Sequence, residues 1–421
     1  MDQALLSALS FAVSIILIKS IPKSEFGYYS IAVAISLFLI SVQNAVVNTP
    51  LAVLLVTKKD LDKRQYVSSL CYGQFLAVLP AVCLALVLIA VMQYRGFDAT
   101  QISIAAALCS AVVGLLFREF LRSYLFAEGT PIQVLKMDVL YVAIFMGFLA
   151  FTYLFWEMSV AAVFIQMGMS ALLVALLFSR NLEYRIHLSS VRESYRENWI
   201  FGRWSLMGVC ITHTQNYSYL YLLGAILGSL AVADVSAARL LLMPMMLVQV
   251  GWGKIAVPHG SRLREEGQIH RFFKEQIVSS LFFLVAVAVY VVLLLVFSGA
   301  LQNYLLSEKY SSSFRYVVTW GAIFVAGFIT MNASYGLQVM MMFRTITKIS
   351  FFTMVVTVGS AYFLIQGYGI GGGLVALLLG QILLGVGLWI SFGKIVFSIM
   401  EKQSVTLLGK DEKLKFSNPP P

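Results

Sequence analysis

The chain has 421 residues, of which 60% are hydrophobic and 12% charged, and its mean hydropathy is +0.85. Soluble globular chains carry about twice that charged fraction, so this composition excludes a soluble globular protein and also a disordered one. The net charge of +10 does not indicate nucleic-acid binding, because most Lys and Arg residues form short clusters between apolar runs, the pattern that orients membrane proteins.

Twelve apolar runs are candidates for helices that cross a bilayer, which takes about 20 residues each. The runs are continuous and show no alternation between the two faces of a strand, so helices are favoured over a barrel. The predicted helices cover residues 4–19, 28–56, 66–92, 100–126, 132–154, 159–179, 200–227, 231–258, 272–299, 314–343, 345–366 and 370–399. The sequence therefore predicts an all-α integral membrane protein.

The distribution of basic residues predicts the orientation of these helices. With both termini in the cytoplasm, most Lys and Arg residues fall on inner loops, as positive-inside topology requires. The outer side then holds only Lys19, Lys23, Arg95, Lys309 and Arg315. We therefore expect a multi-pass membrane protein with both ends in the cytoplasm.

Two long polar stretches predict the domain organisation. The predicted parts are an N-terminal six-helix bundle (1–179), a cytoplasmic linker (180–199), a C-terminal six-helix bundle (200–399) and a disordered cytoplasmic tail (400–421). The entries to the second and eighth helices, Ile21–Ser30 and Leu227–Ser236, are weakly alike. Internal duplication is typical of transporters with a site between the halves, and chance similarity of two apolar hairpins is the alternative.

Motifs for nucleotide hydrolysis, metal binding and nucleophilic catalysis are missing from the sequence. The stretch Gly251–Lys254 is followed by Ile255 rather than the Ser or Thr of a phosphate-binding loop, and Gly367–Gly372 lies between two membrane helices with no strand before it. The four cysteines lie in apolar runs, and the four histidines have no metal-site spacing. We expect no cofactor, no enzymatic activity and no ATP hydrolysis by this chain.

Arg239 is the leading candidate for a substrate-binding residue. It lies about 8 residues inside its predicted helix, or roughly 12 Å at 1.5 Å per residue, close to the midplane of the bilayer. A charge at that depth is costly and marks a candidate functional site. The alternative is an ion pair with Asp234 that only stabilises packing, and Asp234 is also a weak candidate for ion coupling.

Polar residues in two other helices are further candidates for the wall of a substrate cavity. His213 and Gln215 lie in an unusually polar stretch of the seventh helix, and His213 should lie within about 10 Å of the depth of Arg239. Asn44 and Asn48 are four residues apart on one face of the second helix. Hydrogen bonding between helices is the alternative role for each of them.

Arg118 and Arg122 are one turn apart near the inner end of the fourth helix and are candidates for substrate binding. Glu119 can pair with Arg122, which would leave Arg118 as the freer charge. The alternative is that both side chains reach up to the membrane interface. Asp138 in the fifth helix is a candidate partner for them or a proton carrier.

The chain resembles a polysaccharide flippase of the multidrug/oligosaccharidyl-lipid/polysaccharide (MOP) exporter superfamily. The resemblance rests on Asp2–Ser7 opening the first helix, Phe26–Tyr29 entering the second, Asn44-Ala45 before Thr49–Leu51, and Val232–Leu240 in the second half. It extends over nearly the whole chain. In this sequence Met1 directly precedes the Asp2-Gln3 pair, where relatives carry a short basic leader.

The resemblance implies two six-helix bundles related by a pseudo-two-fold axis, arranged as a V around a cationic cavity as in multidrug (MATE) exporters. It implies a substrate, undecaprenyl-diphosphate-linked oligosaccharide, moved from the inner to the outer leaflet for O-antigen, lipopolysaccharide or exopolysaccharide synthesis. Partners would include membrane lipids and polysaccharide polymerase or export proteins, and no nucleic acid.

Two other classes remain open at the level of sequence. A MATE-type multidrug or small-molecule antiporter would share the fold, but we expect it to place carboxylates in its cavity for cationic drugs. A membrane-embedded polymerase or glycosyltransferase would carry a large outer loop with catalytic residues. The short outer loops of this chain argue against such an enzyme.

Overall fold

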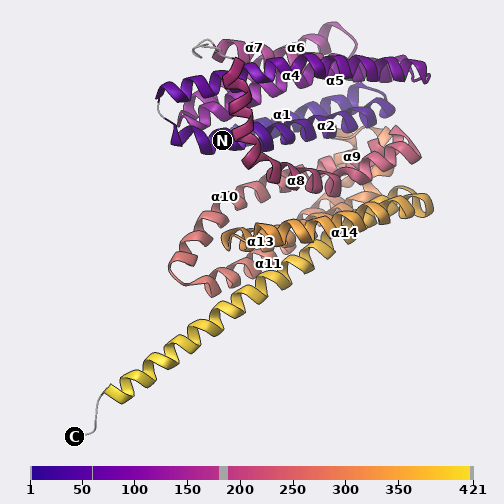
Figure 1. Ribbon diagram of the computed structural model, residues 1–421. Helices are drawn as coiled ribbons and strands as arrows, with labels where there is room; N and C mark the ends of the chain where they lie inside the picture. Colours follow the sequence, from indigo (N-terminus) through magenta and orange to yellow (C-terminus); the bar gives the residue numbers. More distant parts are fainter. Residues whose placement is uncertain (1, 59, 180–187, 418–421) are drawn as a thin grey trace. The chain divides into compact units, whose positions relative to one another are not determined.

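The computed structural model describes residues 2–58, 60–179 and 188–417, and in this part of the chain the regular secondary structure is entirely helical (Figure 1). In chain order the elements are α1 (Asp2–Ser20), α2 (Lys23–Gln43), the π-helix η1 (Asn44–Asn48), α3 (Thr49–Leu54), the 3-10 helix η2 (Leu55–Thr57), α4 (Asp60–Tyr94), α5 (Ala99–Ala127), α6 (Pro131–Phe155), α7 (Val160–Ser179), α8 (Leu188–Leu227), α9 (Ser229–Leu241), α10 (Met243–Glu265), α11 (Ile269–Val296), α12 (Ser298–Tyr304), the 3-10 helix η3 (Glu308–Tyr316), α13 (Val317–Val339) and α14 (Phe343–Ser417).

Each of the twelve predicted stretches contains helix in the structure. Within the described residues, eight helices are long and apolar enough to cross a membrane, or nine when α9 and α10 are counted as one interrupted span. One of the eight, Phe343–Glu401, is 59 residues long and turns at Gly369, where φ is 60°, so it provides two predicted spans. The chain is therefore a multi-pass membrane protein.

Prolines interrupt two of the predicted spans but not a third. The second span passes through η1 just before Pro50, and the eighth is interrupted at Leu242, with Pro244 in the first turn of α10. Proline lacks an amide donor and suits the first turn of a new helix segment. Pro80 lies inside α4, and that helix continues through it without a break.

The chain forms two compact units. The first comprises Met1–Leu240 and Leu301–Ser313, and the second comprises Leu241–Ala300 and Phe314–Pro421. In the first unit, α5 packs along α7, and a Cβ atom at Gly114 would lie only 2.2 Å from the carbonyl oxygen of Gly168. The close approach of these two helices therefore requires glycine at this crossing.

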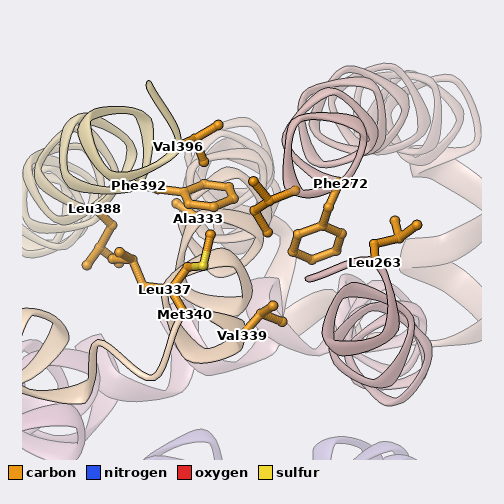
Figure 2. Packing of buried hydrophobic residues seen from close by; sticks show 10 residues of the cluster. Leu263, Phe272, Ala333, Leu337, Val339, Met340, Leu388, Phe392 and Val396 are labelled. Atoms are coloured by element: carbon orange, nitrogen blue, oxygen red, sulfur yellow. The ribbon is translucent and has the colours of Figure 1, made fainter. Parts of the chain in front are cut away.

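The second unit is built around α13, which packs against α10, α11 and α14. Its core includes Phe272 of α11 and Phe392 of α14, both fully buried, with ring centroids 6.4 Å apart (Figure 2). Leu337 and Ala333 of α13 are also fully buried in this cluster. The core holds α14 firmly along the stretch that ends near residue 400.

The units differ from the predicted division at 180–199. Helix α8 begins at Leu188 rather than at 200, and it packs against α2, η1 and α4 of the first unit. Residues 180–187 of the predicted linker lie outside the described part of the chain. The backbone is helical to Ser417 in the predicted disordered tail, and 418–421 lie outside the description. The two six-helix halves and the tail stay predictions.

Candidate functional site

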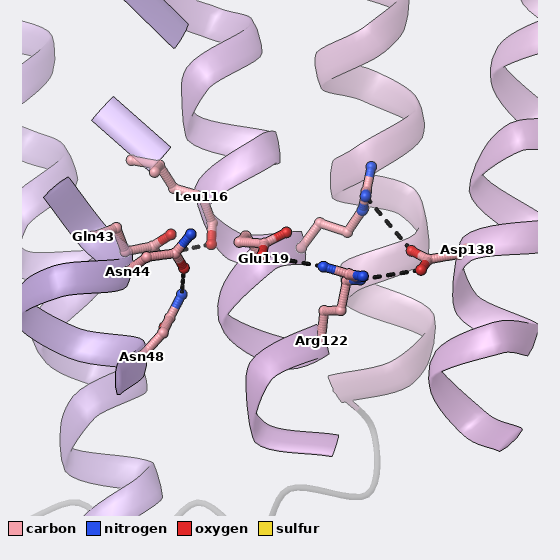
Figure 3. Close-up of polar contacts among 8 residues, drawn as sticks. Gln43, Asn44, Asn48, Leu116, Glu119, Arg122 and Asp138 are labelled. Atoms are coloured by element: carbon pink, nitrogen blue, oxygen red, sulfur yellow. Dashed lines mark hydrogen bonds and ion pairs between the residues drawn. The ribbon is translucent and has the colours of Figure 1, made fainter. Parts of the chain in front are cut away.

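Arg118 and Arg122 on α5 both contact Asp138 on α6. The Nε atom of Arg122 donates to Asp138 Oδ2 at 3.0 Å, and Arg118 Nη2 lies 3.5 Å from Asp138 Oδ1. Arg122 Nη1 also lies 3.3 Å from the carboxylate of Glu119 (Figure 3). Two arginines and two carboxylates therefore form one network whose formal charges cancel, and we call these four residues the ionic network.

Asp138 and Arg118 form the buried part of the ionic network. Asp138 is 0% exposed and Arg118 is 6% exposed, and the guanidinium carbon of Arg118 lies 3.9 Å from the ring centroid of Tyr141. Arg118 is therefore not left free by the pairing of Glu119 with Arg122, because Asp138 and Tyr141 on α6 hold it. This arrangement is typical of a structural lock between helices, since removing one charge would leave another buried without compensation.

Amide side chains gather around the π-helix η1. Asn48 Nδ2 donates to Asn44 Oδ1 at 2.6 Å, and Gln43 Nε2 donates to the carbonyl oxygen of Leu116 at 2.8 Å (Figure 3). Gln43 Nε2 also donates to Gln74 on α4. Asn48 is 4% exposed, and its Oδ1 has no hydrogen-bond partner among the described residues. Gln43 is the last residue of α2 and connects that helix with α4 and α5, whereas Asn48 and Asn44 bond to each other within η1.

Arg239 lies near the end of α9 and is surrounded by aromatic side chains of α8. Its guanidinium carbon is 5.3 Å from the ring centroid of Tyr217, and the charge interacts with the side chains of Tyr217 and Tyr219. The side chains of Arg239 and Tyr217 are half-buried. Contact with an aromatic face stabilises a cation by about 0.5–2 kcal/mol without cancelling its charge.

The ring of Tyr217 connects Arg239 to His213. The His213 and Tyr217 rings are stacked at 4.6 Å, and the rings of His213 and Phe38 of α2 are 4.7 Å apart. The Nε2 atom of His213 lies 2.9 Å from the hydroxyl of Tyr221, within hydrogen-bond distance. We call Arg239, Tyr217, His213, Tyr221 and Phe38 the aromatic cluster.

The helical repeat explains why this cluster forms. His213, Tyr217 and Tyr221 are four residues apart, so their side chains form one stripe along α8. Gln215 is two residues from His213 and faces the other way; it is 2% exposed, and its Nε2 has no hydrogen-bond partner among the described residues. Gln215 is therefore not part of the aromatic cluster, although the sequence grouped it with His213.

Asp234 belongs to a third site at the start of α2. Its Oδ1 lies 2.7 Å from the Nζ atom of Lys23 and accepts hydrogen bonds from Ser313 at 2.6 Å and Ser312 at 3.1 Å. Asp234 and Arg239 are five residues apart on one helix, which separates their side chains by about 140° around the axis. The structure thus pairs Asp234 with Lys23, where the sequence had offered Arg239 as its partner.

Sequence reasoning missed Tyr217, Tyr219 and Tyr221 of α8 and the basic partner of Asp234. The spacing of Tyr217 and Tyr221 from His213 was a usable signal, because a helix places residues four apart on the same face. In the described part of the chain, no group of three or more His, Cys, Asp or Glu side chains lies close enough to hold a metal ion.

Comparisons with known proteins place this geometry in a known fold. No protein-family model matches the chain, and no curated protein sequence does either. The chain is similar to a solved inward-facing multidrug resistance MATE family transporter of the MOP superfamily, with a TM-score of 0.74 and 13% identity over 95% of this chain and 96% of that one.

Two further solved structures have the same fold. The eukaryotic MATE transporter AtDTX14 gives a TM-score of 0.66 at 14% identity, with 94% of each chain covered. A MOP superfamily transporter from Pyrococcus furiosus, described as having a binding pocket of reverse polarity, gives 0.63 at 12% identity over 95% of this chain and 94% of that one. The chain therefore has the all-helical fold of the MATE transporters of the MOP superfamily.

Proposed function

We propose that the protein is a transporter that moves lipid-linked oligosaccharide, with an undecaprenyl diphosphate anchor, from the inner to the outer leaflet of the bacterial cytoplasmic membrane. The observation that carries this proposal is the aromatic cluster around Arg239. Arginine binds phosphate oxygens through paired N–H donors. Tyrosine rings offer a flat apolar face for sugar rings and a hydroxyl for hydrogen bonding.

The physical problem that such a transporter solves is desolvation of the diphosphate. A bare diphosphate cannot cross hydrocarbon, because burying an unpaired charge costs far more than one contact returns. A half-buried arginine, a histidine and tyrosine hydroxyls replace part of the lost hydration within the membrane. The lipid tail remains in the bilayer, and alternating access of the MATE-type fold exposes the headgroup to each side in turn.

The second candidate function, a MATE-type multidrug or small-molecule antiporter, is favoured by the names of the structural neighbours. The carboxylates of this chain support it less well. Asp138 is held by Arg118 and Arg122, and Asp234 is held by Lys23. Both carboxylates are therefore engaged by basic side chains, which lowers their capacity to attract a cationic drug.

The test is flipping by purified protein in proteoliposomes that contain a lipid-diphosphate oligosaccharide, with sugar exposure at the outer face as the readout. We expect Arg239→Ala to lower the rate at least tenfold and Arg239→Lys to retain part of it, because lysine keeps the charge but not the paired donors. Arg203→Ala is the matched control, since Arg203 is an exposed arginine of α8.

Two results would contradict the proposal. Wild-type flipping by a well-folded Arg239→Ala protein would remove this residue from the substrate path. Transport of a cationic dye, with no flipping of the oligosaccharide lipid, would favour the antiporter. Reporter fusions after Arg192 and Lys410 test the proposed cytoplasmic orientation of those two segments.

A further inference from the structure

Helix α14 presents different chemistry on adjacent faces over residues 388–401. Leu388, Phe392 and Val396 recur every four residues and are buried in the core of the second unit (Figure 2). Because successive residues of a helix are about 100° apart, the residues that follow each of these lie on the neighbouring face. That neighbouring face is held in place by the core behind it.

The neighbouring face lines an open groove of about 660 Å³ between α11 and α14. Trp389 and Phe397 form its apolar wall together with Phe273 of α11, whose ring packs edge-to-face against both at 5.8 Å and 6.3 Å. Trp389 is fixed by a hydrogen bond of 2.9 Å from its indole nitrogen to the carbonyl oxygen of Ile329. The wall is therefore preformed.

Gly393 keeps the groove open. A Cβ atom at this position would have one neighbour within 4 Å, the Cζ atom of Phe273 at 4.0 Å. The backbone there has room for a side chain and carries none. The volume of the groove therefore depends on glycine at 393, and a larger residue would fill it without a clash at its Cβ.

One edge of the groove is polar. Lys394, Ser398 and Glu401 also line it, and spacings of four and three residues place them on one side of α14. All three are exposed, and neither Lys394 nor Glu401 has an ion-pair or hydrogen-bond partner among the described residues. Seven helical residues span about 10.5 Å, so a cation and an anion stand apart at the edge of an aromatic groove.

We propose that this groove binds a phosphatidylethanolamine molecule. An acyl chain lies along the aromatic wall, the lipid phosphate contacts Lys394 and Ser398, and the ammonium group donates to Glu401. A headgroup with a phosphate and an ammonium two carbons apart complements a lysine and a glutamate on flexible side chains. Charge-assisted hydrogen bonds to both ends of the headgroup orient the lipid.

The charges of the groove discriminate against other phospholipids. Phosphatidylglycerol would bring its phosphate near Glu401 and offer no cation to it. Phosphatidylcholine carries a quaternary ammonium, which has no N–H to donate to the carboxylate. Phosphatidylethanolamine satisfies both charged residues, which is why the proposal commits to it.

The test is native mass spectrometry of the purified full chain after incubation with equal amounts of phosphatidylethanolamine, phosphatidylcholine and phosphatidylglycerol of identical acyl chains. We expect phosphatidylethanolamine to be retained roughly two- to fivefold over phosphatidylcholine, the size of one exposed charge interaction. Glu401→Gln should remove that preference and leave total lipid retention nearly unchanged. Lys394→Gln should lower retention of all three lipids.

A pair of glycine variants tests the groove itself. Gly393→Leu should fill it and reduce lipid retention, whereas Gly359→Leu, on the same helix with no atom within 4 Å of its Cβ, should not. Gel filtration and thermal unfolding report whether each variant folds. If Gly393→Leu does not fold, Lys394→Gln and Glu401→Gln still test whether the groove binds the lipid. Both substitutions lie at exposed positions and should leave the fold intact.

Three outcomes would overturn the proposal. These are equal retention of phosphatidylethanolamine and phosphatidylcholine, a preference for phosphatidylglycerol, and a preference for phosphatidylethanolamine that survives Glu401→Gln. The experiment measures lipid binding alone, so its result does not depend on the transported substrate.

Discussion

Arg118 and Arg239 both lie within apolar helices, yet their surroundings differ in kind. Arg118 is 6% exposed and belongs to a network with Asp138 in which the formal charges cancel. Arg239 is half-buried, and its partners include the ring of Tyr217 and the side chain of Tyr219. A carboxylate neutralises an arginine, whereas a phenol ring holds it in place and preserves its charge. The two arginines are therefore distinguished by the chemistry of their partners, and the proposed binding role of Arg239 follows from that difference.

The third charged site follows the structural pattern. Asp234 is paired with Lys23, and two serine hydroxyls complete its hydrogen bonds. The same acceptor atom thus connects α9 to the start of α2 and to the segment that contains η3. Among the three sites, the aromatic cluster places a half-buried arginine beside a tyrosine ring that can stack on sugars. The proposed function therefore rests on this cluster.

The largest effect is expected from Asp138→Asn. This change leaves Arg118 and Arg122 in the buried network with one carboxylate fewer, which costs about 3–5 kcal/mol of folding free energy in buried ion pairs. Thermal unfolding and the yield of monodisperse protein measure the loss. Glu119→Gln is the matched control and should cost less than about 1 kcal/mol, because that side chain is partly exposed. Equal stability of Asp138→Asn and wild type would contradict a structural role for the network.

A smaller effect, on transport rather than stability, is expected from Tyr217. Tyr217→Leu removes the ring that Arg239 and His213 share, and we expect a loss of about tenfold in flipping, the size of a desolvated cation–π contact. Tyr217→Phe keeps the ring and should retain most of the activity. The measurement is the initial rate in proteoliposomes at equal amounts of folded protein. A greater loss with phenylalanine than with leucine would place the hydroxyl, not the ring, in the binding role.

The helices and the fold were predictable from the sequence, and the pairing of charges was predictable in part, since Glu119 was expected to pair with Arg122 and Asp138 was a candidate partner of the two arginines. Each membrane-spanning helix satisfies its backbone polar groups by internal hydrogen bonds and exposes apolar side chains to lipid. Hydropathy along the sequence therefore locates these helices. The pairing of Asp234 with Lys23 depends on contacts between segments far apart in the chain, which no local periodicity records. The sequence offered Asp138 as a candidate partner of Arg118, but the burial of Arg118 depends on how α6 packs against α5.

The candidate site was predictable in part. Arg239 and His213 stand out because ionisable residues are rare in apolar helices. Tyr217 and Tyr221 do not stand out, since tyrosine is common in membrane helices, and only their spacing from His213 points to a stripe. Pro80 lies within a continuous helix, which shows that proline predicts a possible break and that neighbouring packing determines whether it occurs.

The smallest effect is expected from the coupling between Asp234 and Arg239. This coupling tests most directly whether Arg239 differs from Arg118, which is paired with a carboxylate. Asp234→Asn alone should lower the free energy of unfolding by about 1–3 kcal/mol, because it weakens the ion pair with Lys23 and leaves that charge partly buried. The double variant Asp234→Asn, Arg239→Ala should show the sum of the single effects within about 0.5 kcal/mol, as expected for residues that share no partner. Flipping by the double variant should stay as low as in Arg239→Ala. Recovery of transport or stability in the double variant would show that the two residues act as a pair, and Arg239 would then join Arg118 among the structural charges.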